Sequence, residues 1–441
     1  QEVLIKKDFL NLTIAMIQKN TSLLELFDEF VKKYPTSSLS DDVLLFKTQV
    51  LLDAQKEDEA IISLDRIIKE YPKGDMIHQA VFMKAFLLAK NNKISDSIEN
   101  LKYLQKISFK NSLEHAQATY WIARLSIYPS LNEFVVEQKT KEATDAIATL
   151  KSLASEKIGT IYSTLSYSLL KHLKQNVTKP TWKKSSLDKL TILQKDLSEE
   201  ENFIFEMIKY GFRKEALNIL KKQKIEVKNY KKLINTVYLY KEMNMIEQGY
   251  VQLIAANYHG DIYLKKEYTD IYPFIAYPKP FLKEVKNALN KYKVEESFLY
   301  AIMRQESFFV PQAVSWASAL GLCQLTYPTS LEYAKKNNLT ITDKKDLFDP
   351  NINLLLGANV IFDYSNKLKN PVLGLAGYNA GVYAVTVWQK KYNPKFVDYF
   401  IEQIPQAYKE TRNYLKKVIA NMWNYDLLYD NKKELFFNFT L

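Results

Sequence analysis

The sequence predicts an all-α protein on the strength of two observations. Glycine is scarce, at 10 of 441 residues, while lysine is abundant, and this composition suits helices better than β-sandwiches or barrels. Apolar residues recur along much of the chain at the i, i+3, i+4 spacing of amphipathic helices. The chain is longer than one ordinary domain, so we expect two or three.

The first part of the chain repeats with a period of 37 residues. Tyr34-Pro35 recurs as Tyr71-Pro72, and the apolar run 43–47 is echoed by 80–84, with a third copy from 118. Each copy holds two segments of helical period joined by a short polar turn, which is typical of an α-solenoid. The sequence around Tyr71-Pro72 resembles a tetratricopeptide repeat, in which proline closes the second helix.

Further along, from about 142 to 268, the helical pattern continues but the repeat cannot be traced. Pro180 indicates a break, and Gly211 a turn between two helices. Three prolines within 272–280 cannot lie inside a helix, so they mark the clearest boundary. The sequence thus predicts three parts, which are a solenoid over 1–179, a further helical or linker region over 180–268 and a compact helical domain over 269–441.

The last part is expected to be almost wholly helical. Asp349-Pro350 has the pattern of an N-cap followed by proline at the first helical position. We expect helices at about 281–291, 296–307, 328–337, 350–369, 371–378, 381–391, 396–403 and 407–424.

Glu306 is the residue whose chemistry most needs explanation. It lies near the end of helix 296–307, which is apolar nearly all round, and Pro311 prevents a long continuation. Apolar surroundings and the negative end of a helix dipole both raise the pKa of a carboxyl group. A carboxyl that stays protonated near neutral pH can act as a general acid. The alternative is that Glu306 pairs with Arg304 or with a distant lysine.

Four further signals occur within about 110 residues of Glu306. Ser315 could hydrogen-bond a carboxyl, and 321–324 offers a tight turn with an amide side chain. In 376–381, Tyr378 and Asn379 lie between glycines, which allow close approach of the backbone to a ligand. The segment 410–414 adds a second carboxylate with Thr and Arg. Each of these alone is commonly a turn or a cap, but together they favour a functional site.

These motifs resemble those of the soluble lytic transglycosylases, which cleave bacterial peptidoglycan. Glu306-Ser307 matches the family's Glu-Ser motif, and 321–324 its Gly-Leu-Met-Gln motif. Likewise, 377–381 matches Ala-Tyr-Asn-Ala-Gly and 410–414 matches Glu-Thr-Arg-x-Tyr. The match covers roughly 270–425 in detail. It extends loosely to the whole chain, because these enzymes carry a helical superhelix before a lysozyme-like catalytic domain.

The chain departs from the family pattern at several places. Cys323 stands where the family usually has Met, Ser318 where it has Gly, and Gly377 where it has Ala. Two extra residues separate Ile404-Pro405 from Glu410. The solenoid is also shorter than in the largest family members.

The resemblance implies cleavage, without water, of the β-1,4 bond between N-acetylmuramic acid and N-acetylglucosamine. Glu306 would protonate the glycosidic oxygen and then take the proton of the muramoyl C6 hydroxyl, giving a 1,6-anhydro sugar. Glu410 would contact the stem peptide or support Tyr378, and Trp316, Tyr327 and Trp388 would be sugar-stacking surfaces. The sugar and its N-acetyl group would be oriented by Ser315, Gln324, Tyr378 and Asn379.

Composition adds expectations about partners and compartment. The net charge of +11 suits an acidic polymer such as peptidoglycan with its stem-peptide carboxylates, whereas nucleic-acid binding has no motif behind it. No apolar run reaches the length of a membrane span, and the single cysteine, Cys323, excludes an internal disulfide. A start at Gln1 fits a mature periplasmic chain after signal-peptide removal, or a trimmed one.

We expect a monomer without cofactor, on whose solenoid cell-wall synthesis or division proteins dock. No metal site is expected, because the four histidines are scattered and none lies in the last domain; they are His78, His115, His172 and His259.

Two other functions remain open at this point. A hydrolase of the same fold, related to goose-type lysozyme, would need a second carboxylate to activate water. The candidates for that carboxylate are Asp343, Asp346, Asp349 and Asp363. A non-catalytic scaffold would only bind glycan or partner proteins, and the intact Glu306, Ser315 and Gln324 argue against it.

Overall fold

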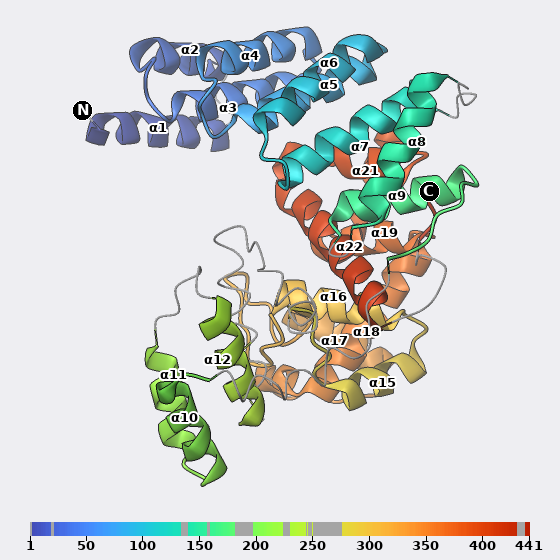
Figure 1. Cartoon of the computed structure of the whole chain (residues 1–441). Helices are drawn as coiled ribbons and strands as arrows, with labels where there is room; N and C mark the ends of the chain where they lie inside the picture. Colours follow the sequence, from blue (N-terminus) through green and yellow to red (C-terminus); the bar gives the residue numbers. More distant parts are fainter. Residues whose placement is uncertain are drawn as a thin grey trace. The chain divides into compact units, whose positions relative to one another are not determined.

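The structure is a computed structural model that describes residues 2–18, 22–133, 140–156, 159–180, 197–223, 230–243, 245, 249, 276–429 and 437–441. Over these residues the chain forms twenty α-helices and two 3-10 helices, and β-structure is confined to isolated bridges (Figure 1). The all-α prediction is therefore confirmed. No described helix is long and apolar enough to cross a membrane.

The chain divides into two compact units. The first comprises Gln1–Ala154, Leu169–Asn176 and Pro405–Ala407, and the second comprises Ser155–Ser168, Val177–Ile404 and Tyr408–Leu441. The predicted domain limits near 179 and 268 stay predictions, and the second of them lies outside the described residues. The proline-rich boundary is described only from residue 276, and neither residues 181–196 after Pro180 nor His259 belong to the described residues.

The first unit is built of consecutive helices joined by short turns. Its helix α5 begins and ends 37 residues after α3, and α6 begins and ends 37 residues after α4, so the sequence repeat is a structural repeat. Its helices are α1 (Glu2–Ile17), α2 (Leu23–Lys33), α3 (Ser40–Asp53), α4 (Glu57–Glu70), α5 (Ile77–Lys90), α6 (Ile94–Ile107), α7 (Leu113–Ile127) and α8 (Lys141–Ala154).

The turn within each repeat is also the same. Gln55 and Asn92 follow their helices in the left-handed conformation, with φ of 62° and 59°. The next backbone N–H donates to the carbonyl five residues earlier, at 2.8 and 2.9 Å, which satisfies an orphan carbonyl at the helix end. On the core side, Leu64 in one repeat and Leu101 in the next are fully buried.

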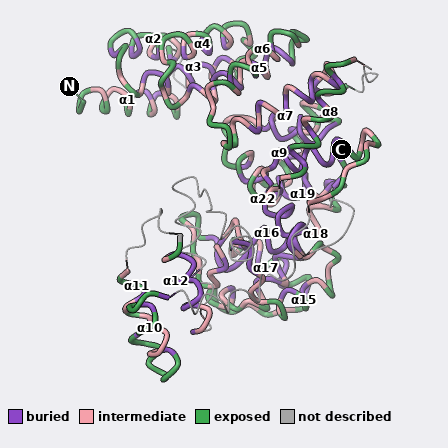
Figure 2. Tube along the Cα trace, in the orientation of Figure 1, coloured by how far each residue is buried: buried purple, intermediate pink, exposed green. Residues whose placement is uncertain are grey.

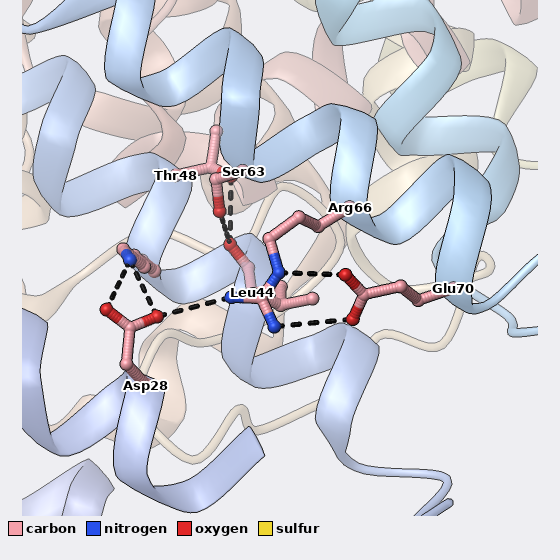
Figure 3. A network of polar contacts seen from close by, with 7 residues as sticks. Asp28, Leu44, Thr48, Ser63, Arg66 and Glu70 are labelled. Carbon is pink, nitrogen blue, oxygen red and sulfur yellow. Dashed lines mark hydrogen bonds and ion pairs between the residues drawn. The ribbon is translucent and has the colours of Figure 1, made fainter. Parts of the chain in front are cut away.

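Polar contacts join neighbouring helices of the first unit (Figure 3). Asp28 of α2 accepts from Arg66 of α4 at 3.3 Å, and Arg66 also binds Glu70 one turn further on. These charges are partly exposed, so each pair contributes little to stability. The buried hydroxyl of Ser63 donates to the Leu44 carbonyl at 3.0 Å and thereby ties α4 to α3.

The second unit contains every helix predicted between 281 and 424. The ends agree within two residues except in α22, which continues to 429 because its last turns are buried. Its helices are α9 (Ile161–His172, shared with the first unit), α10 (Glu199–Lys209), α11 (Arg213–Lys222), α12 (Tyr230–Glu242), α15 (Leu282–Lys291), α16 (Glu296–Glu306), α17 (Tyr327–Lys336), α18 (Pro350–Lys367), α19 (Pro371–Ala380), α20 (Val382–Tyr392), α21 (Val397–Gln403) and α22 (Lys409–Tyr429).

Several local predictions are confirmed in this unit. The Asp349 carboxylate caps α18 by accepting from the N–H groups of Asn351 and Ile352, at 2.7 and 3.2 Å, with Pro350 at the first helical position. Gly211 makes the turn between α10 and α11 with φ of 92°. Helix α16 is buried from Ser297 to Met303, and it packs against the largely buried α22 (Figure 2).

Candidate functional site

Glu306 is the last residue of α16, and its surroundings favour the protonated acid. Burial raises the pKa of its carboxyl from 4.5 to about 7. The hydroxyl of Tyr414 lowers the pKa and opposes this effect, while the nearby carboxylate of Glu410 raises it further. A carboxyl with a pKa raised in this way can hold or release a proton near neutral pH, which suits a group that must give and take one proton.

Arg304 does not form an ion pair with Glu306, which was the alternative explanation for this carboxylate. The Arg304 guanidinium donates to the Ala276 carbonyl and to the Asn421 side chain, both at 3.0 Å, and lies over the ring of Tyr277 at 4.6 Å. Within the described ranges, no lysine or arginine forms an ion pair with Glu306. The raised pKa follows from this arrangement.

The chain reverses directly after Glu306 through an unusual backbone. Phe308 and Phe309 both have left-handed conformations, with φ of 49° and 64°. Such conformations cost non-glycine residues on the order of 1–2 kcal/mol each. Ser307 holds the reversal in place, because its hydroxyl donates to the Leu322 carbonyl at 2.8 Å. The end of α16 is thus fixed to the segment that carries the next site residues.

Ser315 and Gln324 lie in one loop, which is closed by hydrogen bonds within itself. The Ser315 hydroxyl oxygen accepts from the Ala319 N–H at 3.0 Å and keeps its own hydrogen to donate. The Gln324 amide nitrogen donates to the carbonyls of Ala313 and Gly321, at 3.1 and 2.9 Å. Since only an NH2 group can bond two carbonyls, the Gln324 side-chain oxygen is the part that can accept from a ligand.

The turn at Gly321 tolerates no side chain. Its φ is 78°, and a Cβ atom would lie 2.4 Å from the Leu347 carbonyl oxygen and 2.2 Å from the Asn353 side chain. Asn353 is buried in this place and accepts from the Cys323 N–H at 2.8 Å. The buried Cys323 packs with its sulfur against Gly357, so the smaller residue found at the family's Met position lets α18 approach closely.

Tyr378 and Asn379 stand in the last turn of α19, and both are held by neighbours. The Tyr378 hydroxyl donates to the Cys323 carbonyl at 2.7 Å, and burial raises the pKa of this hydroxyl strongly. The side-chain amide oxygen of Asn379 accepts from the Thr411 hydroxyl at 2.6 Å. That contact leaves the Asn379 amide nitrogen as a donor for a ligand.

Thr411 and Tyr414 are site residues whose roles the sequence reasoning missed. Both stand in the first turns of α22, and Tyr414 is only 5% exposed. In the described part of the chain, its hydroxyl has no partner at hydrogen-bonding geometry, although it lies close enough to Glu306 to lower the pKa of that carboxyl. The helical i, i+4 spacing of Glu410 and Tyr414 could have indicated that both side chains face one direction.

Of the seven predicted site residues, Glu306 lies near Tyr378 and Glu410, and Asn379 follows Tyr378 and binds Thr411 of α22. Ser315 and Gln324 share the loop whose Cys323 carbonyl binds Tyr378. Tyr327 begins α17, and the contact found for its ring is with the ammonium group of Lys344 at 5.7 Å. Trp316 is 94% exposed, whereas Trp388 is 4% exposed and packs edge-on against Tyr408.

The four aspartates that could have supplied a second carboxylate are engaged elsewhere. Asp343 and Asp346 form a capping box for the 3-10 helix Lys344–Phe348, and Asp349 caps α18. Asp363 accepts from Tyr333 and pairs with Lys367 at 3.0 Å. Over the described ranges, one group of three carboxylates has metal-ligand proximity, namely Asp41, Asp42 and Asp75 of the first unit.

Fold and site together define a class of protein. A helical solenoid is followed in the sequence by a lysozyme-like helical domain, in which one carboxyl of raised pKa lies at the end of a buried helix. Residues 283–399 match the family described as the transglycosylase SLT domain. This part of the chain is thus similar to transglycosylase SLT domains, and about a third of the chain is similar to proteins named soluble lytic murein transglycosylases.

A Haemophilus influenzae protein named as a soluble lytic murein transglycosylase is 34% identical over 163 residues, which make up 36% of this chain and 27% of that protein. The soluble lytic murein transglycosylase of Escherichia coli is 31% identical over 140 residues, 31% of this chain and 21% of that protein. The chain thus covers about a quarter of the length of these curated relatives.

Solved structures that are similar over nearly the whole chain include one of a lytic transglycosylase. It is an inactive mutant of the lytic transglycosylase Slt from Pseudomonas aeruginosa, with a TM-score of 0.61 and 20% identity, over 92% of this chain and 60% of that one. At this identity the likeness shows the fold, and it confirms the predicted order of a solenoid followed by a lysozyme-like domain.

Proposed function

We propose that the protein is a peptidoglycan lytic transglycosylase that cleaves the β-1,4 bond between N-acetylmuramic acid and N-acetylglucosamine. The observation that carries the proposal is the Glu306 carboxyl, whose pKa burial raises to about 7, inside a transglycosylase SLT domain. The names of the relatives support the substrate class, since they are called murein transglycosylases.

In the proposed reaction, protonated Glu306 gives its proton to the glycosidic oxygen as the bond from that oxygen to C1 of the muramoyl sugar breaks. The carboxylate then takes the proton of the C6 hydroxyl, whose oxygen bonds to C1 and forms the 1,6-anhydro ring. Atoms and protons balance without water, and Glu306 ends the cycle protonated. One carboxylate suffices because the nucleophile is part of the substrate, and intramolecular attack has a high effective molarity.

The roles of the other residues follow from the donor and acceptor groups that hydrogen bonds within the protein leave available to a ligand. Ser315 and Asn379 present donors and Gln324 an acceptor to the sugar and its N-acetyl group. Tyr378 shapes the site through its bond to Cys323. Glu410 is exposed and near Glu306, where it is placed to contact the stem peptide.

Two aromatic residues complete the proposed glycan surface. Trp316 lies in the Ser315 loop with 94% of its surface exposed, which suits stacking on a sugar ring. Tyr327 is the second candidate for such stacking. The same proposal places the chain in the periplasm as a monomer, with peptidoglycan as its polymer substrate and cell-wall synthesis or division proteins docking on the solenoid.

The decisive experiment is mass spectrometry of the products from purified peptidoglycan, digested with wild type and with Glu306→Gln. We expect anhydro-muropeptides from wild type only. Glu215→Gln, which changes an exposed carboxyl on α11, is the matched control and should act as wild type does. Anhydro products from the Glu306→Gln variant at a wild-type rate would remove Glu306 from its role.

A hydrolase of the same fold is the second candidate, and one observation favours it. The Glu410 carboxylate is near enough to Glu306 to raise the pKa of that residue, so Glu410 is a candidate for the second carboxylate that the four aspartates do not provide. In that case the products would carry reducing ends, and Glu410→Gln would abolish them. If wild type gave no products at all, the scaffold function would stand instead.

A further inference from the structure

A short segment far upstream of the matched domain belongs to the same compact unit and packs on α22. Gly159 and Asn424 exchange hydrogen bonds, at 2.9 Å from the Gly159 N–H and 3.0 Å to its carbonyl. A Cβ atom on Gly159 would lie 2.4 Å from the Trp423 ring, so the backbone touches the indole directly. The ring of Tyr167 lies 5.2 Å from that of Trp423.

The same segment supplies one member of a buried polar cluster. The Tyr162 hydroxyl donates to the Glu402 carboxylate at 3.2 Å and accepts from the Lys416 ammonium, also at 3.2 Å. Lys416 pairs with Glu402 at 2.8 Å, and Arg412 lies close enough for the charge of Glu402 to act on it. Tyr162 is 1% exposed and Glu402 is buried, so the cluster is shielded from water.

Buried charges of this kind keep their positions, because each lost contact leaves a group desolvated without compensation. The cluster joins three elements, α9, α21 and α22, and two of its members stand in the first two turns of α22. Those same turns carry Thr411, which holds Asn379, and Tyr414, which lies beside Glu306. One face of this helix is thus anchored while another serves the site.

We propose that Tyr162 is a positioning residue for the reaction, and this inference rests on the proposed function. Its hydroxyl, seated between Glu402 and Lys416, fixes the rotation and axial position of the first turns of α22. Thr411 then keeps the Asn379 amide turned with its nitrogen toward the ligand, and Tyr414 keeps its place beside Glu306. The domain defined by residues 283–399 is completed by residues 159–168, which lie more than a hundred positions before it.

The test compares Tyr162→Phe with Tyr292→Phe in the full chain. The Tyr292 hydroxyl also donates a hydrogen bond, to Asn337 at 2.6 Å. Tyr292 lies in the turn between α15 and α16, away from α22, so Tyr292→Phe controls for the loss of one hydroxyl. We expect kcat for glycan cleavage to fall about tenfold in Tyr162→Phe, with KM within about twofold of wild type. In a Thr411→Val background the same change should cost less than about twofold, because the two act through one helix.

A second readout needs no activity and separates this inference from the proposed function. The groups that shift the pKa of Glu306 are Tyr414 and Glu410 of α22, whereas the charge of Glu306 raises the pKa of Tyr378 on α19 and of Cys323 in the loop. Tyr414 lowers the pKa of Glu306 and Glu410 raises it, so a change in the position of α22 should shift the Glu306 midpoint in a carbon-13 NMR titration.

The shift in Tyr162→Phe should have the same sign as in Tyr414→Phe and be absent in Tyr292→Phe. An unchanged midpoint together with an unchanged kcat would overturn the inference. So would equal losses in both Thr411 backgrounds, or loss of folding in Tyr162→Phe alone, since either result would assign the hydroxyl to stability.

Discussion

Replacing Glu306 by glutamine should make the protein more stable at alkaline pH while it removes the acid. The folded state holds the pKa of this carboxyl at about 7 against an ordinary 4.5, so it binds a proton that the unfolded chain releases. That proton stabilises the fold fully below pH 4.5, and the stabilisation is lost as the pH rises towards 7. A shift of this size corresponds to about 3 kcal/mol at most, and partial exposure of Glu306 reduces it to about 1–3 kcal/mol.

The assay is denaturant unfolding of wild type, Glu306→Gln and the exposed control Glu215→Gln, at pH 5 and pH 8. Glutamine has the shape of the acid and never ionises, so Glu306→Gln should unfold near wild type at pH 5. At pH 8 it should exceed wild type by about 1–3 kcal/mol, while the control follows wild type at both values. A Glu306→Gln protein that is no more stable than wild type at pH 8 would refute the claim that the fold penalises this charge.

Three further outcomes are expected. The cleavage rate should fall about tenfold between pH 6 and pH 8 as Glu306 loses its proton, and a flat profile would contradict its role as acid. Ser97→Ala should raise the free energy of unfolding by about 1 kcal/mol, because this buried hydroxyl has no partner in the described residues. Ala60 already occupies the equivalent position one repeat earlier. A lower stability of Ser97→Ala in urea would count against this reasoning. Gly159→Ala should cost about 1–3 kcal/mol because its Cβ would clash with Trp423, and an unchanged melting curve would disprove that contact.

Much of the fold could be predicted because its signals are local. The helical spacing of apolar residues, the N-cap at Asp349 and the glycine at 211 each act within a few turns of chain, and the structure has all three. The extra length of α22 was missed because its end is set by tertiary burial rather than by a stop signal.

The site could be predicted only in part, for a physical reason. Glu306 stood out because a lone carboxylate on an apolar helix is anomalous in any fold. The hydrogen bond from Thr411 to Asn379 joins residues 32 positions apart, and that between Tyr162 and Glu402 joins residues 240 apart. No local pattern indicates such contacts, since they exist only once the helices have packed.

The hydrogen bonds within the site also bear on what it would recognise. Hydrogen bonds within the fold use both amide hydrogens of Gln324 and the amide oxygen of Asn379. Gln324 is therefore left with an acceptor, and Asn379 with a donor. An acetamido group presents the complementary pair, an N–H and a carbonyl, whereas a plain hydroxyl can satisfy only one side chain well. Because an unmatched polar group costs free energy when a ligand excludes water, this polarity would favour N-acetylated sugars over unmodified ones. Deacetylated peptidoglycan should then be a poorer substrate for wild type, and the difference should shrink in Asn379→Leu, since that variant has already lost the donor.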